Sequence, residues 1–330
     1  MTGGHGDHAL AERLRALLGK RHQVVAGAAV APGEVRVASI GASPDADFEI
    51  GSISKGVTGL LYADALDRGE ITPSTTLGDL LPLDGAAAAG LTLGSLAVHR
   101  SGLPSLPESA SPIKKTLSLW LNGTNPYGEH VDALVAQARL VKLRKTKARY
   151  SNFGFELLGH ALAGASGMSY AQLVRRRIAD PIGLTTFYVP GSPDELRPSA
   201  LLGRSRLRRA RQPWTGEAIG PAGGIRASIE DMARLVQSLL NGTAPGIAAL
   251  EPVDTLAWRG VRIGAAWITI EVHGRSITWH NGGTGGFRSW LGLDRDAGTG
   301  AVVLSGTSVS VDRAGFRLLA ELTRQAPTGP

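Results

Sequence analysis

The chain of 330 residues contains no cysteine. A disulfide framework, a thiolate nucleophile and a cysteine-based zinc site are therefore excluded. No His-Glu-x-x-His sequence occurs, and the histidines with an ordered context are scattered without ligand spacing: His99, His130, His160, His273 and His280. We expect neither a metal nor a cofactor, so any covalent chemistry has to use an oxygen or nitrogen nucleophile.

Long hydrophobic runs are also missing, since no stretch approaches the roughly 18 apolar residues of a membrane helix. Residues 9–18 give an amphipathic pattern, without the charged region and apolar run of a signal peptide. We therefore expect a cytoplasmic protein without a membrane span. Its 43% hydrophobic and 19% charged residues are ordinary for a folded chain, and the length allows two lobes or one large domain.

Lysine and arginine exceed the acidic residues by 35 − 28 = 7, and the excess is clustered. The clusters are Lys142, Arg144, Lys145, Lys147 and Arg149, and Arg204, Arg206, Arg208, Arg209 and Arg211. They lack the interleaved aromatic residues of a single-strand platform, so we expect no nucleic-acid partner. A solvated basic face is favoured; the alternative is attraction of an acidic partner or of a phosphate-bearing, carrier-linked substrate.

The hydrophobic pattern predicts a helix over residues 8–18, a strand hairpin over 24–30 and 34–40, and a helix from Ser52 to Asp67. The middle of the chain favours helices over 153–165 and 170–178, the second ending before Pro181. A capping box of Ser228 and Asp231 opens a helix over 229–240, and Gly242 lies just past its end.

The last ninety residues alternate in the manner of antiparallel strands, over 266–272, 276–280, 288–293 and 301–304, before a closing helix over 313–322. These strands can pair with the hairpin near the N-terminus. We predict an α+β fold with an antiparallel sheet built from both chain ends and flanked by helices. Residues 1–69 and 211–330 form this discontinuous domain, residues 70–210 form a mainly α lobe, and the active site lies in the cleft between them.

The sequence Gly51-Ser52-Ile53-Ser54-Lys55 places a serine and a lysine three residues apart at a helix start. Both side chains share one helical face, so Lys55 can reach the Ser52 hydroxyl and take its proton once burial lowers the basicity of the amine. The spacing alone is weak, because Ser111 and Lys114 match it too and an N-cap serine with a surface lysine is common.

Two further segments carry suitable chemistry. Tyr150-Ser151-Asn152 precedes a helix; a phenol serves as a base near neutrality only when adjacent positive charge, such as Lys55, holds it as phenolate or shares its proton. Asn152 can grip a substrate amide or orient Lys55. At the end of a strand, His280-Asn281-Gly282-Gly283 lets a substrate backbone approach, and the Gly283 amide is a candidate to form an oxyanion hole with the Ser52 amide.

Together these segments resemble the penicillin-binding-protein-like serine hydrolases, in particular the class C β-lactamase, DD-peptidase and esterase branch. Softer matches are His99-Arg100-Ser101-Gly102-Leu103-Pro104 and Pro221-Ala222-Gly223-Gly224-Ile225. The resemblance runs from about residue 48 to 290. It implies a β-lactamase/transpeptidase-like fold, with Ser52 as the acylated nucleophile, Lys55 and Tyr150 as the proton-handling pair, and Asn152, His280, Asn281 and Gly282 as substrate-binding residues.

His280 departs from the family pattern, because β-lactamases of this branch carry lysine there in a Lys-Thr-Gly triad. A lysine is a permanent cation for a substrate carboxylate, whereas a histidine is largely neutral at pH 7. We therefore expect a serine acyl hydrolase of esterase or amidase type acting on a small ester, amide or thioester. The alternatives are an acyltransferase with the same acyl-Ser52, a D-amino-acid peptidase or β-lactamase, and a catalytically silent ligand-binding module.

Other hydrolase classes are disfavoured by their missing signatures. No serine stands in the Gly-x-Ser-x-Gly context of an α/β-hydrolase. The glycine-rich run at 282–286 is not followed by a helix with Lys-Ser/Thr, which disfavours a phosphate loop.

Overall fold

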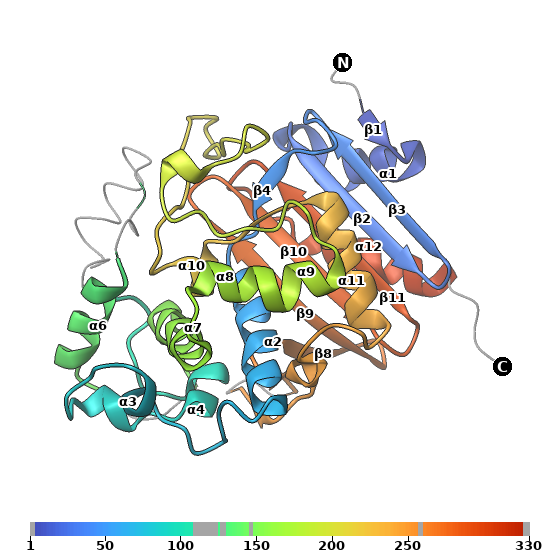
Figure 1. Ribbon diagram of the computed structural model, residues 1–330. Helices are drawn as coiled ribbons and strands as arrows, with labels where there is room; N and C mark the ends of the chain where they lie inside the picture. Colours follow the sequence, from blue (N-terminus) through green and yellow to red (C-terminus); the bar gives the residue numbers. More distant parts are fainter. Residues whose placement is uncertain (1–3, 108–124, 126–129, 145–147, 257–259, 326–330) are drawn as a thin grey trace.

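The structure, a computed structural model, describes residues 4–107, 125, 130–144, 148–256 and 260–325 (Figure 1). Within these residues the main sheet has nine strands, in the order β1-β3-β2-β11-β10-β9-β8-β7-β6. The strands are β1 Gly4–Gly6, β2 Val25–Ala31, β3 Glu34–Ile40, β6 Asp254–Thr255, β7 Arg262–Ile263, β8 Ile268–Val272, β9 Arg275–Gly283, β10 Arg288–Asp294 and β11 Thr299–Ser305.

The predicted α+β fold with a sheet from both chain ends is confirmed, because β2 from the N-terminal hairpin pairs with β11 near the C-terminus. All neighbouring strands run antiparallel. The pairing brings Val25 opposite Ser305 and Val30 opposite Gly300. The two ends of the chain therefore build one hydrogen-bonded surface.

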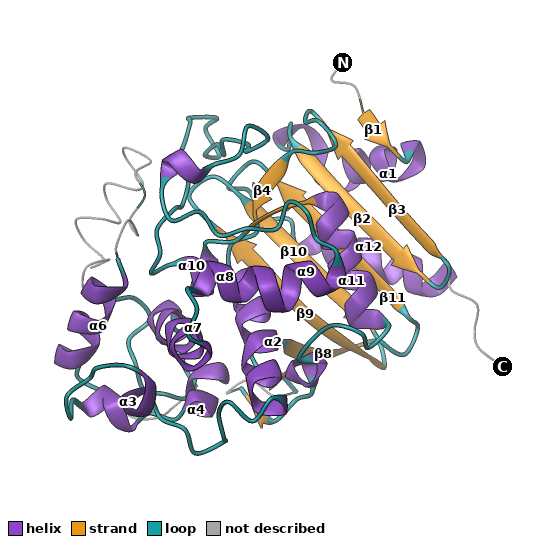
Figure 2. Cartoon of the chain, in the orientation of Figure 1, coloured by secondary structure: helices purple, strands orange, loops and turns teal. Residues whose placement is uncertain are grey.

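Helices cover both faces of this sheet (Figure 2). Alternate residues of β11 face opposite sides: Val302 and Leu304 join the larger core, and Ala301 and Val303 join the smaller one. This is the two-residue period of a strand buried on both faces. The larger core is covered by α2 (Ile53–Asp67) and α11 (Ile229–Leu240), and the smaller by α1 (His8–Leu18) and α12 (Asp312–Gln325).

The remaining helices gather mainly beside one end of the sheet, around α2 (Figure 1). They are α3 Leu77–Leu80, α4 Leu93–Ala97, α6 Val131–Leu140, α7 Asn152–Ser166, α8 Tyr170–Val174, α9 Asp180–Ile182 and α10 Gly220–Gly223. Helix α2 packs against α7 and α10 as well as the sheet. It is therefore buried on nearly all sides, which explains its lack of a polar face. The boundaries of the two predicted domains stay a prediction.

Two local predictions are wrong in detail. The chain stays helical through Pro181, because a wider π-type turn over Arg175–Ala179 leads into α9, and proline fits the first turn of a helix, where its missing N–H is not needed. At α11 the Ser228 hydroxyl accepts the Asp231 N–H at 3.2 Å, as predicted. The Asp231 carboxylate, however, accepts from the backbone and hydroxyl of Thr186, so the reciprocal half of the capping box is replaced by a tertiary contact.

A small second sheet, absent from the prediction, pairs β4 (Asp47–Glu49) with β5 (Arg226–Ser228). Fully buried Arg226 reaches both acidic residues, at 2.5 Å to Asp47 and 3.2 Å to Glu49. Burial raises the pKa of Glu49, which the Arg226 charge opposes. Because β4 leads directly into Gly51 and Ser52, this ion-paired sheet anchors the segment that carries the serine.

Among the described residues, no helix is long and apolar enough to cross a membrane. The second serine and lysine pair, Ser111 and Lys114, lies outside the described residues.

Candidate active site

The serine of the first motif stands at the turn between β4 and α2. Gly51 has φ +53°, and a Cβ there would lie 2.6 Å from the amide nitrogen of Gly283. Only glycine lets the turn approach the end of β9 so closely. The Ile50 carbonyl accepts the Ser289 hydroxyl at 2.7 Å, and its amide donates to Ile225 at 3.1 Å, so two neighbouring segments hold the turn.

The Ser52 hydroxyl is not an ordinary helix cap. Ser52 occupies the N-cap position of α2, yet its side chain makes no capping hydrogen bond. Instead the amine of Lys55 donates to the Ser52 oxygen at 3.1 Å and to the Ala222 carbonyl of α10 at 2.6 Å. Ser52 is half-buried, so its hydroxyl stays within reach of an incoming molecule.

Lys55 is 0% exposed. Burial lowers its pKa from 10.5 to about 7, because a desolvated ammonium is disfavoured; the nearby Glu156 charge opposes the shift. About half of the Lys55 amines are then neutral at pH 7 and able to accept a proton. The lysine three residues after the serine thus has the properties of a general base.

Tyr150 completes the group. The Ser52 hydroxyl interacts with its phenol, and the Lys55 nitrogen lies 4.8 Å from the centre of its ring. The structure thus brings an alcohol, an amine and a phenol together from two distant segments. Although the residue is 43% exposed as a whole, removal of its hydroxyl from water raises the pKa of Tyr150, and the Ser52 hydrogen bond only partly offsets this.

The raised pKa changes the expectation for Tyr150. A phenolate held by Lys55 requires the pKa of the phenol to fall, and here it rises while that of the amine falls. The neutral phenol is consequently the resting form, and Lys55 is the group better suited to take the first proton.

His280 lies on β9 and is buried. Its Nδ1 is 2.6 Å from the Asn281 carbonyl oxygen, which can only accept, so Nδ1 carries the proton and the neutral ring has its lone pair at Nε2. Burial, followed by the Lys55 charge, lowers the pKa of His280 to about 4. Within the described chain Nε2 is buried without a hydrogen-bond partner. His280 is therefore an uncharged acceptor and not a substitute cation.

The neighbours of His280 fall on different sides of the strand. The Asn281 amide donates to Asp312 of α12 at 3.2 Å, so this side chain faces away from His280, and its predicted contact with substrate stays a prediction. Gly282 packs against the serine turn, where a Cβ would lie 2.1 Å from the Ile50 carbonyl. Its neighbour Gly283 puts its amide beside Gly51, and its role in an oxyanion hole stays a prediction.

Asn152 opens helix α7. Its backbone amide donates to Ser105 at 2.9 Å, and the preceding Ser151 caps the helix by accepting the Gly154 N–H at 2.9 Å. Asn152 is half-buried and lies two residues after Tyr150 in the sequence. Its predicted contact with Lys55 or substrate stays a prediction.

Comparison with known proteins supplies the family. The family model described as beta-lactamase matches residues 10–324. The chain belongs to the beta-lactamase family. Over 205 residues it is 31% identical to the D-alanyl-D-alanine-carboxypeptidase/endopeptidase AmpH of Escherichia coli K12, covering 60% of this chain and 50% of that protein. The chain therefore spans about half the length of this curated relative.

Two further relatives cover more of this beta-lactamase-family chain. Penicillin-binding protein 4 of Amycolatopsis lactamdurans is 25% identical over 300 residues, covering 83% of this chain and 76% of the relative. A class C beta-lactamase from Rhodobacter sphaeroides superposes with a TM-score of 0.78 at 24% identity, covering 97% of this chain and 99% of the other. The latter likeness shows the shared fold.

Two parts of this beta-lactamase-family site could not be recognised from the sequence. The Ala222 carbonyl that holds Lys55 belongs to the Pro-Ala-Gly-Gly-Ile turn, and His99, which contacts Tyr150, belongs to the His-x-Ser-Gly-Leu-Pro turn. Both turns resemble the family pattern, but their residue types alone indicate no role. A backbone carbonyl has no sequence signature, so only its position in the fold could reveal it.

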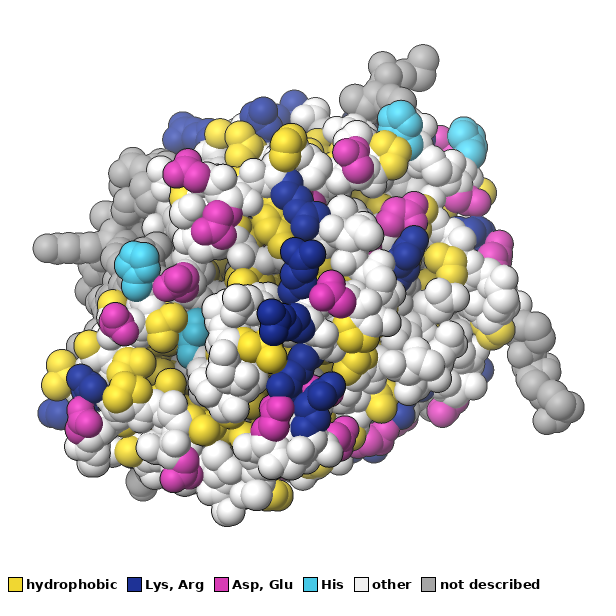
Figure 3. All heavy atoms as spheres, viewed as in Figure 1, with side chains coloured by type: hydrophobic (Ala, Val, Ile, Leu, Met, Phe, Trp, Pro, Cys, Tyr) yellow, Lys and Arg dark blue, Asp and Glu magenta, His cyan; other side chains and the backbone are white. Residues whose placement is uncertain are grey.

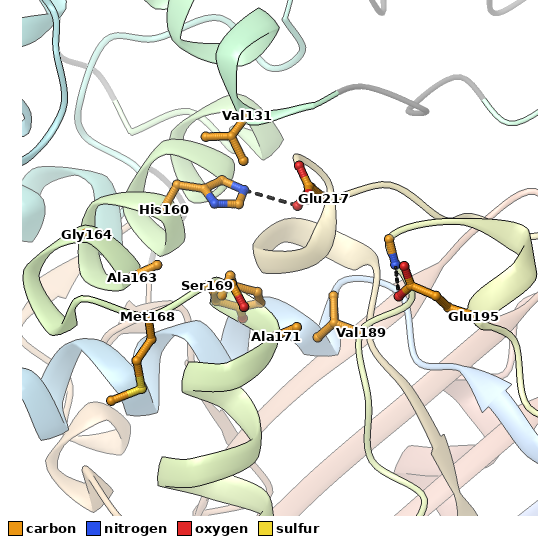
Figure 4. Close-up of a pocket in the computed structure, with 12 residues that line it drawn as sticks. Val131, His160, Ala163, Gly164, Met168, Ser169, Ala171, Val189, Glu195 and Glu217 are labelled. Atoms are coloured by element: carbon orange, nitrogen blue, oxygen red, sulfur yellow. Dashed lines mark hydrogen bonds between the residues drawn. The ribbon is translucent and has the colours of Figure 1, made fainter.

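A separate cavity of about 400 Å³ lies beside α7 and α8, lined among others by Val131, His160 and Met168 (Figure 4). The His160 ring lies 3.1 Å from the Glu217 carbonyl. None of Ser52, Lys55 or Tyr150 lines this cavity. It is thus distinct from the serine site.

Charge on the surface is uneven, with lysine and arginine side chains aligned across the middle of one face (Figure 3). Independently of this row, the arginines of the second predicted cluster at 204, 206, 208 and 209 are exposed. Among the described residues, no group of three His, Asp or Glu side chains is placed to hold a metal ion.

Proposed function

We propose that this chain is a serine acyl hydrolase of esterase or amidase type that works through an acyl-Ser52 intermediate. The observation that carries the proposal is the fully buried amine of Lys55, 3.1 Å from the Ser52 oxygen and with its pKa lowered to about 7. Membership of the beta-lactamase family supports the same chemistry. An apolar residue in this position would make the fold more stable than a buried lysine does, so stability alone does not account for Lys55.

The proton path follows from the two pKa shifts. Neutral Lys55 takes the proton of the Ser52 hydroxyl as the Ser52 oxygen attacks the acyl carbon. The backbone amides of Ser52 and Gly283 then donate hydrogen bonds to the negatively charged oxygen of the tetrahedral intermediate. The phenol of Tyr150 donates its proton to the leaving group and recovers one from Lys55. Water then cleaves the acyl-serine ester by the reverse path, with Asn152 contacting the substrate.

The uncharged acceptor at His280 favours substrates without a carboxylate at that position. A carboxylate facing the Nε2 lone pair would meet repulsion, whereas a hydroxyl, an amide N–H or an ammonium could donate to it. Neutral esters and amides are thus favoured over peptides ending in a free carboxylate. The likeness to the carboxypeptidase/endopeptidase AmpH favours a second candidate, a D-amino-acid peptidase or β-lactamase.

The first experiment is labelling with a fluorophosphonate, read by intact mass. We expect one adduct on the wild type, no adduct on Ser52→Ala and a rate at least about 100-fold lower for Lys55→Met. Ser74→Ala, a change at an exposed serine, is the matched control and keeps the label. Full labelling of Ser52→Ala would refute the proposal, and failure of every acyl probe on folded wild type would favour a silent binding module.

The second experiment separates the substrate classes. Wild type is compared on p-nitrophenyl esters, nitrocefin, and an acyl-D-Ala-D-Ala peptide beside its C-terminal amide. We expect the amide to exceed the free acid and His280→Lys to reverse that order, because the lysine adds a cation. A wild-type preference for the free acid would establish the peptidase candidate instead. Adding an alcohol acceptor tests the predicted alternative of acyl transfer, which would yield a new ester in place of the free acid.

A further inference from the structure

His99 holds the segment around Tyr150 from both sides. The backbone carbonyl of His99 accepts the Arg149 N–H at 2.8 Å, and its ring Nδ1 accepts the Ser151 N–H at 3.2 Å. The two hydrogen bonds therefore fix the residue before and the residue after Tyr150. One residue supplies both acceptors.

The ring of His99 also packs on the tyrosine. The centres of the His99 and Tyr150 rings are 4.6 Å apart at 38°, and His99 contacts Phe155 of α7 at 4.8 Å. Because Tyr150 is 43% exposed, much of its surface lacks packing from other residues. His99 itself is only 5% exposed and so offers a fixed platform.

The backbone of His99 is strained to reach this position. Its φ is +59°, a left-handed conformation that is unfavourable for a non-glycine residue. Glycine or asparagine would relieve the strain, so a histidine here indicates that its side chain is needed.

The hydrogen bond fixes the protonation of the ring. Nδ1 faces an N–H donor, so it carries the lone pair and Nε2 carries the proton. Burial, then the charge of Lys55, lowers the pKa of His99 well below its usual value, which keeps the ring neutral and the acceptor available.

We infer that His99 is a positioning residue for Tyr150, aligning the phenol with Ser52 through the two flanking hydrogen bonds and the ring contact. The inference rests on the proposed function, because it assumes that Tyr150 transfers a proton. It assigns His99 no contact with substrate. Its effect should accordingly fall on the acylation rate and leave substrate binding largely unchanged.

The test compares two substitutions by single-turnover acylation. His99→Leu removes the ring acceptor, and we expect the rate to fall about 10- to 100-fold with little change in KM. His99→Asn keeps an acceptor near Nδ1 and tolerates positive φ, so it should recover most of the rate. If His99→Leu does not fold, the His99→Asn variant alone decides. A His99→Asn rate within about fivefold of wild type supports positioning through the ring acceptor. A His99→Asn rate as low as that of Tyr150→Phe overturns the inference.

A double-mutant cycle distinguishes positioning from general destabilisation. In a Tyr150→Phe background, His99→Leu should lower the rate by less than about twofold, since the phenol it aligns is gone. His160→Leu, which removes a buried histidine of α7 in edge-to-face contact with Tyr170, is the matched control and should have equal effects in both backgrounds. Equal effects of His99→Leu in both backgrounds would overturn the inference.

The same cycle tests the proposed function separately. A normal rate in Tyr150→Phe alone would remove the role of the phenol, and the role of His99 with it. A slow Tyr150→Phe beside a normal His99→Leu would overturn only the inference about His99.

Discussion

The pH dependence of Ser52 acylation is the sharpest consequence of the buried lysine. With a Lys55 pKa of about 7, the neutral amine makes up about 1% at pH 5, about half at pH 7 and about 90% at pH 8. The acylation rate should therefore rise about 50-fold from pH 5 to pH 7 and less than about twofold above it. An unperturbed lysine would give a tenfold rise for each pH unit through pH 9.

The midpoint can be assigned to Lys55 because burial moves the neighbouring histidines out of this range. The pKa of His280 falls to about 4, and that of His99 falls well below its ordinary value. A midpoint near 7 then reports neither imidazole. The high pKa of Tyr150 places its ionisation far above the midpoint.

The assay is stopped-flow acylation by an activated ester from pH 5 to 9, with the acyl-enzyme quantified by intact mass so that the ionisation of the leaving group does not distort the rate. Lys55→Arg is the decisive variant, because arginine keeps its charge at every pH of the series and cannot serve as the base. Its rate should be low and flat. A flat wild-type profile between pH 5 and 8, or one still rising tenfold per unit above pH 8, would refute the assignment of Lys55 as base.

Three further predictions concern stability. Arg226→Met leaves two buried carboxylates of β4 without their cation and should lower the free energy of unfolding, measured in urea, by about 3–5 kcal/mol. The control Arg262→Met breaks an exposed ion pair and should lower it by less than about 1 kcal/mol. Equal effects of the two substitutions would contradict the buried network. In Gly282→Ala the new Cβ would lie 2.1 Å from a backbone carbonyl oxygen, so the acylation rate should fall and the free energy of unfolding should drop by about 1–3 kcal/mol. The control Gly90→Ala has open space around the new Cβ and should change neither quantity. Lys55→Met should abolish acylation yet stabilise the protein at pH 7 by up to about 4 kcal/mol. The unfolded chain holds this proton to about pH 10.5 and the folded chain releases it near 7, so wild-type stability should rise with pH across that window and the gap in urea midpoints should narrow; a constant gap would contradict the lowered pKa.

Most of the sheet could be predicted because its longer strands are short, largely apolar runs bounded by turn residues. The hairpin of β2 and β3 and the strand β10 agree with the hydrophobic pattern to within about a residue. The strands β4 and β5 could not be found, because three residues are too short for periodicity. The predicted helix end before Pro181 is wrong because a π-type turn places this proline in the first turn of a new helical segment.

The candidate site, like the sheet, has features that the sequence could predict and features that it could not. The motifs located Ser52, Lys55 and Tyr150, because serine and lysine three residues apart share a helical face and the family resemblance supplied the tyrosine. The motif around His280 was found too, but the direction of the Asn281 side chain was not. That direction depends on which face of β9 meets α12, and the face that carries Asn281 is only partly buried.

The sequence by itself determined the chemical groups, the fold class and the order in which the segments occur, because these follow from side-chain type and local periodicity. Only the tertiary structure decided which groups lie within reach of one another and in what protonation state. Lys55 acquires a pKa of about 7 because distant segments remove it from water, and His280 becomes an acceptor because its own strand fixes the tautomer. Both properties arise from desolvation and hydrogen-bond direction, which depend on contacts between residues far apart in the chain.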